Sequence, residues 1–259
     1  MLSSLDRWLA PSPDPVRVAW LKGTTYAHRG QHGHGLIENS PSAFAAAIQA
    51  GLGIECDVQL SVDACAMVFH DAALDRLTDE SGPVEHRYAW QLGELPLRGS
   101  TDCIPTLHDL LTQAAGRVPL LIEIKSRRDR PVAPLCRAVL EAIEGYRGKH
   151  AIMSFDPRVP SWFSRHSPET VRGLVVTEAN ARDAAGSLRR RLALWQARPD
   201  FLAYDIRDLP SRFAAAQRDR GLPLLTWAVS SAALLERARA CADAPIAEAE
   251  GLAAALNAH

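Results

Sequence analysis

The chain is poor in lysine, in paired cysteines and in long apolar runs. Only three of its 259 residues are lysines, at positions 22, 125 and 149, so a lysine at the end of an apolar run stands out. The five cysteines show no C-x-x-C spacing, which favours reduced thiols over a disulfide framework. No segment has the length of a membrane span, and residues 1–21 lack a signal-peptide core. We therefore expect a cytoplasmic protein without a membrane span.

An excess of charge of one sign is also absent. The chain has 29 basic and 30 acidic residues, a formal net charge of −1, and no basic block. A surface that follows the phosphates of a nucleic acid needs such a block, so we expect no nucleic-acid partner. The hydrophobic content of 47% is enough for a substantial core. The oligomeric state stays open.

Short apolar runs alternate with alanine-rich helical stretches from about residue 25 onward, which is typical of βα units around a parallel sheet. The predicted strands are residues 24–28, 53–59, 66–70, 119–125, 151–155, 173–176, 201–205 and 223–229. The predicted helices are residues 40–50, 107–115, 132–144, 181–195, 211–220 and 231–242. Eight strands predict an α/β fold of the TIM (β/α)8-barrel class, a single domain over residues 1–259. The polar, turn-rich residues 72–105 interrupt the alternation of strands and helices, which predicts a small insertion after the third strand.

Two pairs of charged residues are spaced as on strands. Glu55 and Asp57 lie inside one apolar run, and Glu123 and Lys125 close another. Side chains two residues apart point to the same face of a strand, so the two charged side chains of each pair should point into the same space. Buried charges need partners of opposite charge, and carboxylate oxygens suit a hard cation such as Mg²⁺ or Ca²⁺. Cys56 should face the other way, which disfavours zinc.

Further polar groups end other predicted strands. His28 and Arg29 end the first strand and His70 ends the third. In a TIM barrel the carboxyl ends of the strands meet on one face, so these groups should converge with the carboxylates and the lysine. This set of groups predicts phosphoryl transfer. The arginine and the lysine can stabilise the negative charge of a phosphate, one imidazole can accept a proton, and the other can donate one.

These segments together resemble the glycerophosphodiester phosphodiesterase family over residues 25–125. The resemblance rests on Ala27-His28-Arg29-Gly30, Glu38-Asn39-Ser40, Glu55-Cys56-Asp57-Val58-Gln59-Leu60, Val68-Phe69-His70-Asp71, Leu74-Asp75-Arg76-Leu77-Thr78, Ile104-Pro105-Thr106-Leu107 and Ile122-Glu123-Ile124-Lys125. The second half is similar at Ser154-Phe155-Asp156-Pro157 and at Leu225-Thr226-Trp227-Ala228-Val229. Ser40 replaces the family's usual threonine, and residues 242–248 lack its usual glycine-isoleucine-threonine-aspartate ending.

The resemblance implies hydrolysis of a small-molecule glycerophosphodiester to glycerol 3-phosphate and an alcohol, through an internal attack by the glycerol 2-hydroxyl. It implies a role for eight residues. His28 and His70 are the general acid and base; Arg29, Lys125 and Trp227 bind substrate; and Glu55, Asp57 and Glu123 ligate Mg²⁺ or Ca²⁺.

Several alternatives stay open. The protein could be a lysophospholipase-D-like enzyme or a lyase of the same family, which would need an apolar groove or release a cyclic phosphate. It could also be a non-catalytic barrel that binds phosphate. The carboxylates could pair with Arg29 and Lys125 and hold no metal. Glu38 could serve only to orient Arg29, and Asn39 only to cap a helix or turn.

Overall fold

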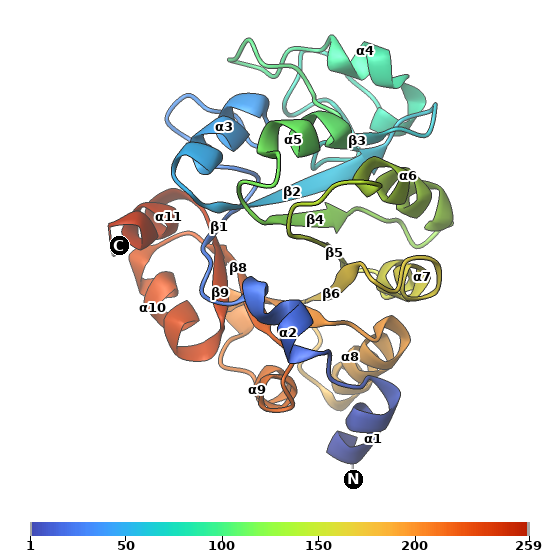
Figure 1. Ribbon diagram of the computed structural model, residues 1–259, viewed down its shortest axis with the longest axis vertical. Helices are drawn as coiled ribbons and strands as arrows, with labels where there is room; N and C mark the ends of the chain where they lie inside the picture. The colour runs from blue at the N-terminus through green and yellow to red at the C-terminus, as the bar shows by residue number, and fades with distance from the viewer. Residues whose placement is uncertain (1, 258–259) are drawn as a thin grey trace. The chain divides into compact units, whose positions relative to one another are not determined.

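The computed structural model describes residues 2–257, which fall into two compact units. The first unit comprises Tyr26–His150. The second unit comprises residues 2–25 together with residues 151–257. Parallel strands separated by helices make up both units (Figure 1).

Three parallel strands form the frame of the first unit. They are β1 (Tyr26–Ala27), β2 (Gly53–Leu60) and β4 (Leu120–Ile124), with β2 between the other two. The helices of this frame are α3 (Pro41–Gln49), α5 (Leu107–Ala114) and α6 (Ala133–Ile143), and α3 packs beside α5 (Figure 1). The Ser40 hydroxyl accepts the N–H of Ala43 at 3.1 Å, so Ser40 caps α3.

The strand predicted at residues 66–70 is not one of the parallel strands. It is a shorter strand, β3 (Ala66–Val68), which pairs antiparallel with the end of β2. The cause is a tight turn after β2, in which the Ser61 hydroxyl accepts the N–H of Cys65 at 2.9 Å. The chain therefore folds back beside β2 instead of crossing over through a helix.

The insertion at residues 72–105 has a hydrophobic core of its own. It contains the 3₁₀ helix η2 (Val84–His86) and the helix α4 (Ala89–Gly93). Its apolar side chains are buried together with Met67 of β3 and with Phe69, which follows β3. They are Leu74, Val84, Leu92, Leu97 and Ile104. Burial of this many apolar groups holds a turn-rich segment in one conformation.

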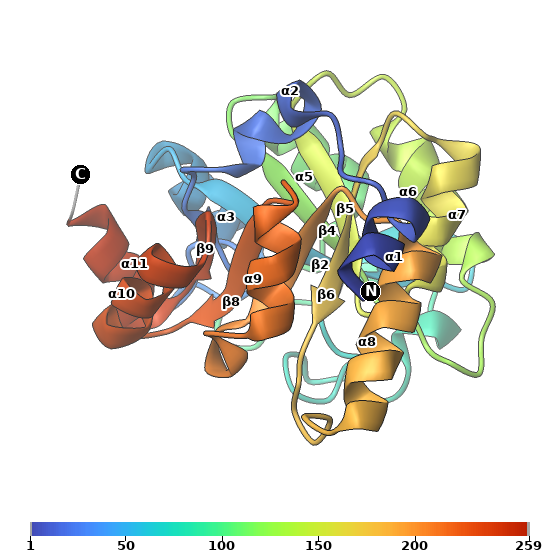
Figure 2. The same cartoon turned by 90° about the horizontal axis from the view of Figure 1, so that it is seen from below.

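Five parallel strands form the sheet of the second unit. They are β5 (His150–Ser154), β6 (Val171–Val176), β7 (Phe201–Asp205), β8 (Leu224–Val229) and β9 (Ala244–Ala247), each paired with the next. Its helices are α1 (Leu2–Leu9), α2 (Pro15–Val18), η1 (Ala19–Leu21), α7 (Arg158–His166), α8 (Ala184–Ala197), η3 (Ile206–Asp208), α9 (Arg212–Asp219), α10 (Ala232–Cys241) and α11 (Ala249–Leu256). In Figure 2, α10 and α11 lie side by side.

The described strands and helices have the order of a TIM (β/α)8 barrel. Eight parallel strands, β1, β2, β4 and β5 to β9, are each followed by a helix, and β3 lies outside this set. The predicted fold class is therefore confirmed, but β9 takes the place that the prediction gave to residues 66–70. The sequence pattern does not predict β9, because its residues Ala-Pro-Ile-Ala include a proline and only one β-branched residue. That the chain forms a single domain stays a prediction.

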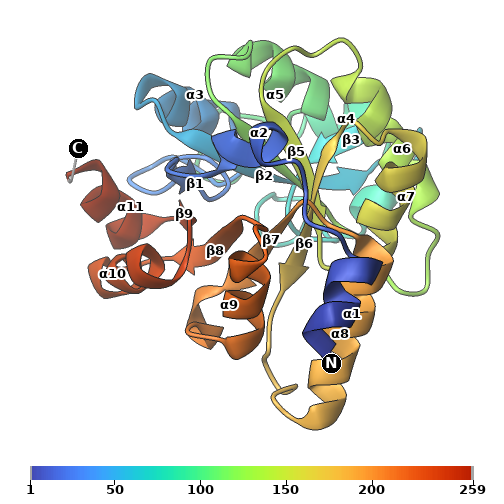
Figure 3. The ribbon, with the colours of Figure 1, turned by 60° about the horizontal axis from the view of Figure 1, so that its bottom comes forward.

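The N-terminal segment is anchored in the second unit through one carboxylate. Asp6 of α1 is 1% exposed and lies beside α8, against which α1 packs (Figure 3). It accepts hydrogen bonds from Arg191, from the Trp195 indole at 2.9 Å and from Gln217 at 3.1 Å. Within residues 2–257, no helix is both long enough and apolar enough to cross a membrane.

We expect Asp6→Ala to lower the free energy of unfolding by about 3 kcal/mol, because it leaves the Arg191 guanidinium without its carboxylate in a largely buried position. Urea unfolding measures the change. Asp219→Ala is the control, since Asp219 is exposed at the end of α9. Equal effects of the two substitutions would contradict the anchoring role of Asp6.

Candidate active site

The register of β2 and β4 brings three carboxylates together in the first unit. Asp57 lies directly opposite Glu123 across the parallel pair, and Glu55 is two residues earlier on the same face of β2. Carboxylate oxygens of the three residues lie within 4.8 Å of one another. Glu55 and Asp57 are 1% exposed and Glu123 is 7% exposed. The predicted acidic cluster is therefore present and buried.

Two cations compensate part of this charge. Lys125 Nζ lies 2.7 Å from Asp57 Oδ1 and 2.5 Å from Glu123 Oε1. Arg29 Nε lies 3.1 Å from Asp57 Oδ2, an ionic contact without hydrogen-bond geometry. Burial opposes ionisation of Asp57, but the charges of Lys125 and Arg29 outweigh it and lower the pKa of Asp57. Burial also opposes the charge of Lys125, yet Asp57 and Glu123 raise its pKa above the ordinary value.

Glu55 is the least compensated member of the cluster. It accepts the backbone N–H of Arg29 at 3.0 Å, and His28 Nε2 lies 3.9 Å from its Oε2. Burial and the negative charge of Asp57 raise the pKa of Glu55 to about 8. Burial likewise raises the pKa of Glu123. Three carboxylates therefore face two cations, so ionisation of all three would leave one negative charge uncompensated in a buried space.

This excess charge fits a divalent cation. The three residues offer only carboxylate oxygens, the donors that hard cations take. Cys56 lies on β2 between Glu55 and Asp57, on the opposite face, where burial raises the pKa of its thiol well above the usual value. The donor set therefore suits a hard ion better than zinc.

His70 reaches the cluster because β3 turns back beside β2. The N–H of Phe69 donates to the carbonyl oxygen of Asp57 at 3.0 Å, so the next residue lies level with the carboxylates. The expectation that His70 ends a barrel strand is thus wrong, although its convergence with the other groups is correct. Burial lowers the pKa of His70.

The loop after β1 shapes the Arg29 position. Arg29 and Asn39 have φ of 54° and 56°, a left-handed backbone that is uncommon outside glycine and is typical of functional sites. Gly30 has φ of 80°, and a Cβ there would come within 3.0 Å of Ala43 and Phe44. Asn39 Nδ2 donates to Asp57 Oδ2 at 3.0 Å. Asn39 thus binds the acidic cluster, and Ser40 is the residue that caps the helix.

A chain of polar contacts links His70 to Arg29. His70 Nδ1 lies 2.6 Å from Asp71 Oδ1, and the Arg76 guanidinium holds Asp71 at 2.6 Å and 3.1 Å. Arg76 also donates to both oxygens of Glu38 at 2.9 Å and 2.7 Å, and Glu38 Oε1 accepts from Arg29 Nη1 at 2.8 Å. The sequence alone assigns no role to Asp71 or Arg76. Their only signal there is their place in the segments that carry the resemblance.

Trp227 is the one predicted site residue outside the first unit. Within the second unit, its indole N–H donates to the Ala203 carbonyl oxygen at 2.9 Å. Its ring meets Phe155 edge-on with 5.3 Å between centroids. Its contact with substrate stays a prediction.

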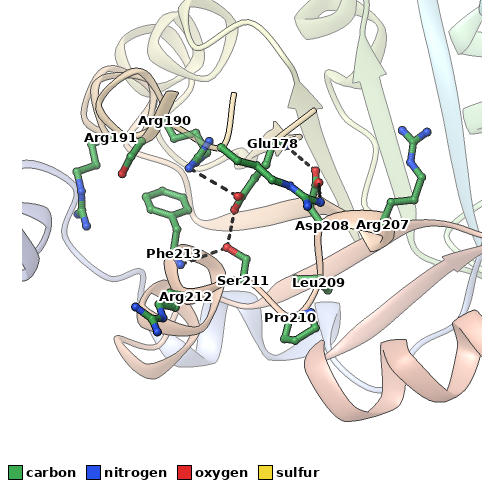
Figure 4. A pocket seen from close by; sticks show the side chains of 12 residues that line it. Glu178, Arg190, Arg191, Arg207, Asp208, Leu209, Pro210, Ser211, Arg212 and Phe213 are labelled. Atoms are coloured by element: carbon green, nitrogen blue, oxygen red, sulfur yellow. Dashed lines mark hydrogen bonds and ion pairs between the residues drawn. The ribbon is translucent and has the colours of Figure 1, made fainter. Parts of the chain in front are cut away.

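A polar pocket of about 590 Å³ lies in the second unit (Figure 4). Five arginines line it, and four of these pair with carboxylates: Arg182 with Asp208, Arg190 with Glu178, Arg191 with Asp6 and Arg207 with Asp205. The Ser211 hydroxyl donates to Glu178 at 2.6 Å, which ties α9 to the loop after β6. These contacts account for four of the five arginines as structural ion pairs.

Comparison with known proteins agrees with the geometry of the first unit. A family model described as the glycerophosphoryl diester phosphodiesterase family matches residues 28–247. The chain belongs to this family. The match includes all eight predicted site residues.

Individual relatives are distant. A glycerophosphodiester phosphodiesterase of Caldanaerobacter subterraneus is 33% identical over 114 residues, which are 41% of this chain and 46% of the relative. The chain spans about half the length of the curated relatives it matches.

Solved structures share the fold. A phosphodiesterase of Oleispira antarctica, solved with the product sn-glycerol-3-phosphate, has a TM-score of 0.79 at 21% identity and covers 92% of this chain and 98% of its own. A glycerophosphodiester phosphodiesterase of Thermotoga maritima has a TM-score of 0.69 at 24% identity and covers 86% and 94%. At these identities the likeness shows the fold alone.

We expect Asp71→Asn to lower the free energy of unfolding at neutral pH, with a difference from the native protein that shrinks as the pH falls. The hydrogen bond from Arg76 lowers the pKa of Asp71 to about 2. A lowered folded-state pKa stabilises above the unfolded value of about 3.9, and this contribution is lost as the pH falls toward the folded value. Urea unfolding at a series of pH values measures the difference.

The control for this prediction is the same substitution in an Arg76→Gln background, where the hydrogen bond is absent. The pH dependence of the Asp71→Asn difference should then be smaller. An equal dependence in both backgrounds would show that Arg76 is not its cause.

Proposed function

We propose that the protein is a metal-dependent phosphodiesterase that hydrolyses glycerophosphodiesters to glycerol 3-phosphate and an alcohol. The observation that carries the proposal is the convergence of His28, His70, Arg29 and Lys125 on one buried acidic cluster. Family membership supports the same reaction. So does the fold shared with the Oleispira enzyme, whose structure was solved with sn-glycerol-3-phosphate.

Glu55, Asp57 and Glu123 would hold the divalent cation, Mg²⁺ or Ca²⁺. When bound, the cation supplies positive charge against the charge that develops at the phosphoryl group. Glu55 would ligate as the carboxylate, although burial and the charge of Asp57 raise its pKa to about 8 in the protein without metal.

Arg29 and Lys125 would hold the phosphate. Both are charged, because the neighbouring carboxylates raise the pKa of each group above its usual value despite burial. Glu38 fixes the direction of the Arg29 guanidinium through the contact at 2.8 Å. A fixed cation stabilises the transition state without having to reorganise during the reaction.

The two histidines divide the proton transfers. His28, beside Glu55, accepts the proton of the glycerol 2-hydroxyl, whose oxygen attacks phosphorus. His70 donates a proton to the alcohol oxygen as its bond to phosphorus breaks. The Asp71 carboxylate accepts the Nδ1–H of His70 at 2.6 Å, so Nε2 is the atom that exchanges the proton.

Water completes the reaction by opening the cyclic phosphate. His70, now neutral, accepts a proton from the water, and the protonated His28 returns one to the 2-hydroxyl oxygen. The sum is one diester and one water converted to glycerol 3-phosphate and one alcohol. Both histidines end in their starting state.

We expect His28→Ala and His70→Ala each to reduce the release of glycerol 3-phosphate by about a hundredfold to ten-thousandfold, the usual contribution of one acid or base. The assay uses glycerophosphocholine with a divalent cation. His108→Ala is the matched control, because His108 is exposed on α5. Full activity in either site variant would remove that histidine from the mechanism, and a protein inactive on all diesters would be a binding barrel.

We expect cation binding to release a proton and to tighten as the pH rises toward about 8, the pKa of Glu55 in the protein without metal. Below that pH the cation must displace the proton from Glu55, because the ligand is the carboxylate. Calorimetric titration with Mg²⁺ or Ca²⁺ in buffers of different ionisation enthalpy counts the protons. The control is Glu55→Gln, which should bind more weakly and without that proton release. Binding that does not depend on pH would contradict ligation by Glu55.

A further inference from the structure

A pocket in the first unit lies next to the proposed catalytic groups. It is a pocket of about 500 Å³ between the end of β2, the loop after β3 and the start of α6. Its apolar walls are Leu60, Ile124, Pro131, Val132, Pro134 and Leu135. This size and composition are those of a pocket for a small molecule with an apolar part.

The pocket is continuous with the proposed site. His70 and Lys125 line it together with the apolar residues. In the proposed reaction, Lys125 holds the phosphate and His70 gives a proton to the departing alcohol oxygen. The group attached to that oxygen therefore lies where the apolar walls begin.

The lining is unsuited to a cationic head group such as choline. No phenylalanine, tyrosine or tryptophan is among the described lining residues, although aromatic faces are the usual partners of quaternary ammonium. Lys125, Arg127 and Arg130 also line it, against Asp71 and Glu85. Arg130 holds Glu85 at 3.0 Å, so this carboxylate is already engaged at the rim.

We infer that this pocket receives the departing alcohol and that the preferred alcohol carries an aliphatic chain. The substrate class is a glycerophosphodiester of a long-chain alcohol, with its phosphate at Lys125 and its chain along Leu60, Val132 and Leu135. The inference rests on the proposed function and adds the identity of the leaving group.

The test is a series of glycerophosphoalkanols of increasing chain length, all used as monomers, with glycerophosphocholine as the polar reference. For the native enzyme with its divalent cation, kcat/KM should rise by about twofold to fourfold for each added methylene until the pocket is full. Initial rates of glycerol 3-phosphate release measure it.

Two substitutions at Val132 and one control locate the effect. Val132 precedes the first turn of α6 and makes no side-chain capping bond, so Val132→Asn adds a polar group to the wall at a position that tolerates asparagine. It should flatten the rise with chain length. Val132→Phe fills the pocket and should stop the rise at a shorter chain. Val62→Asn, an exposed position in the same unit, should leave the rise unchanged.

The outcomes separate the two proposals. A native enzyme that hydrolyses glycerophosphocholine and shows no increase with chain length overturns the aliphatic leaving group and leaves the phosphodiesterase in place. An increase that neither Val132 variant alters overturns the pocket as its cause. Failure to hydrolyse any member of the series overturns the proposed function itself.

Discussion

The site of this protein depends on the burial of three carboxyl groups beside only two cations, fewer than full ionisation of the three would require. Asp57 and Glu123 share Lys125, and Arg29 completes the compensation of Asp57. Glu55 is left with a backbone N–H and a histidine 3.9 Å away. Desolvation of such a set is costly unless a cation joins it. The burial that raises the pKa of Glu55 therefore also prepares the position for a divalent ion, whose charge would favour the carboxylate.

The two interpretations of the acidic cluster, ion pairs or metal ligands, are not exclusive. Ion pairs with Lys125 and Arg29 are present, and they hold Asp57 ionised at 1% exposure. They do not extend to Glu55, whose pKa is raised by burial and by the negative charge of Asp57. Without substrate, Arg29 and Lys125 thus form ion pairs with the acidic cluster. In the proposed reaction these carboxylates hold the two cations in position for the phosphate.

The polar contacts outside the cluster give the proposed catalytic groups a common support. Arg76 binds Asp71 on one side and Glu38 on the other, so the orientations of His70 and Arg29 depend on one guanidinium. The sequence contained all of these residues. Their pairing joins positions up to 38 residues apart, and no spacing rule predicts it, because the contact exists only once the insertion has folded on its own apolar core.

The sequence by itself determined the alternation of strands and helices, the strand positions of Glu55, Asp57 and Glu123, and the chemical class of the site, because these follow from local periodicity and from the types of residue. The tertiary structure decided which strands form the parallel set. Residues 66–70 are not among the eight parallel strands, and β9 is. Because β3 folds back along β2, His70 lies near the carboxylates. The apolar pocket beside Lys125 also depends on the tertiary structure, because its walls combine side chains from β2, β4 and α6. Strand direction and pocket shape depend on contacts between distant segments, and a local pattern carries no information about them.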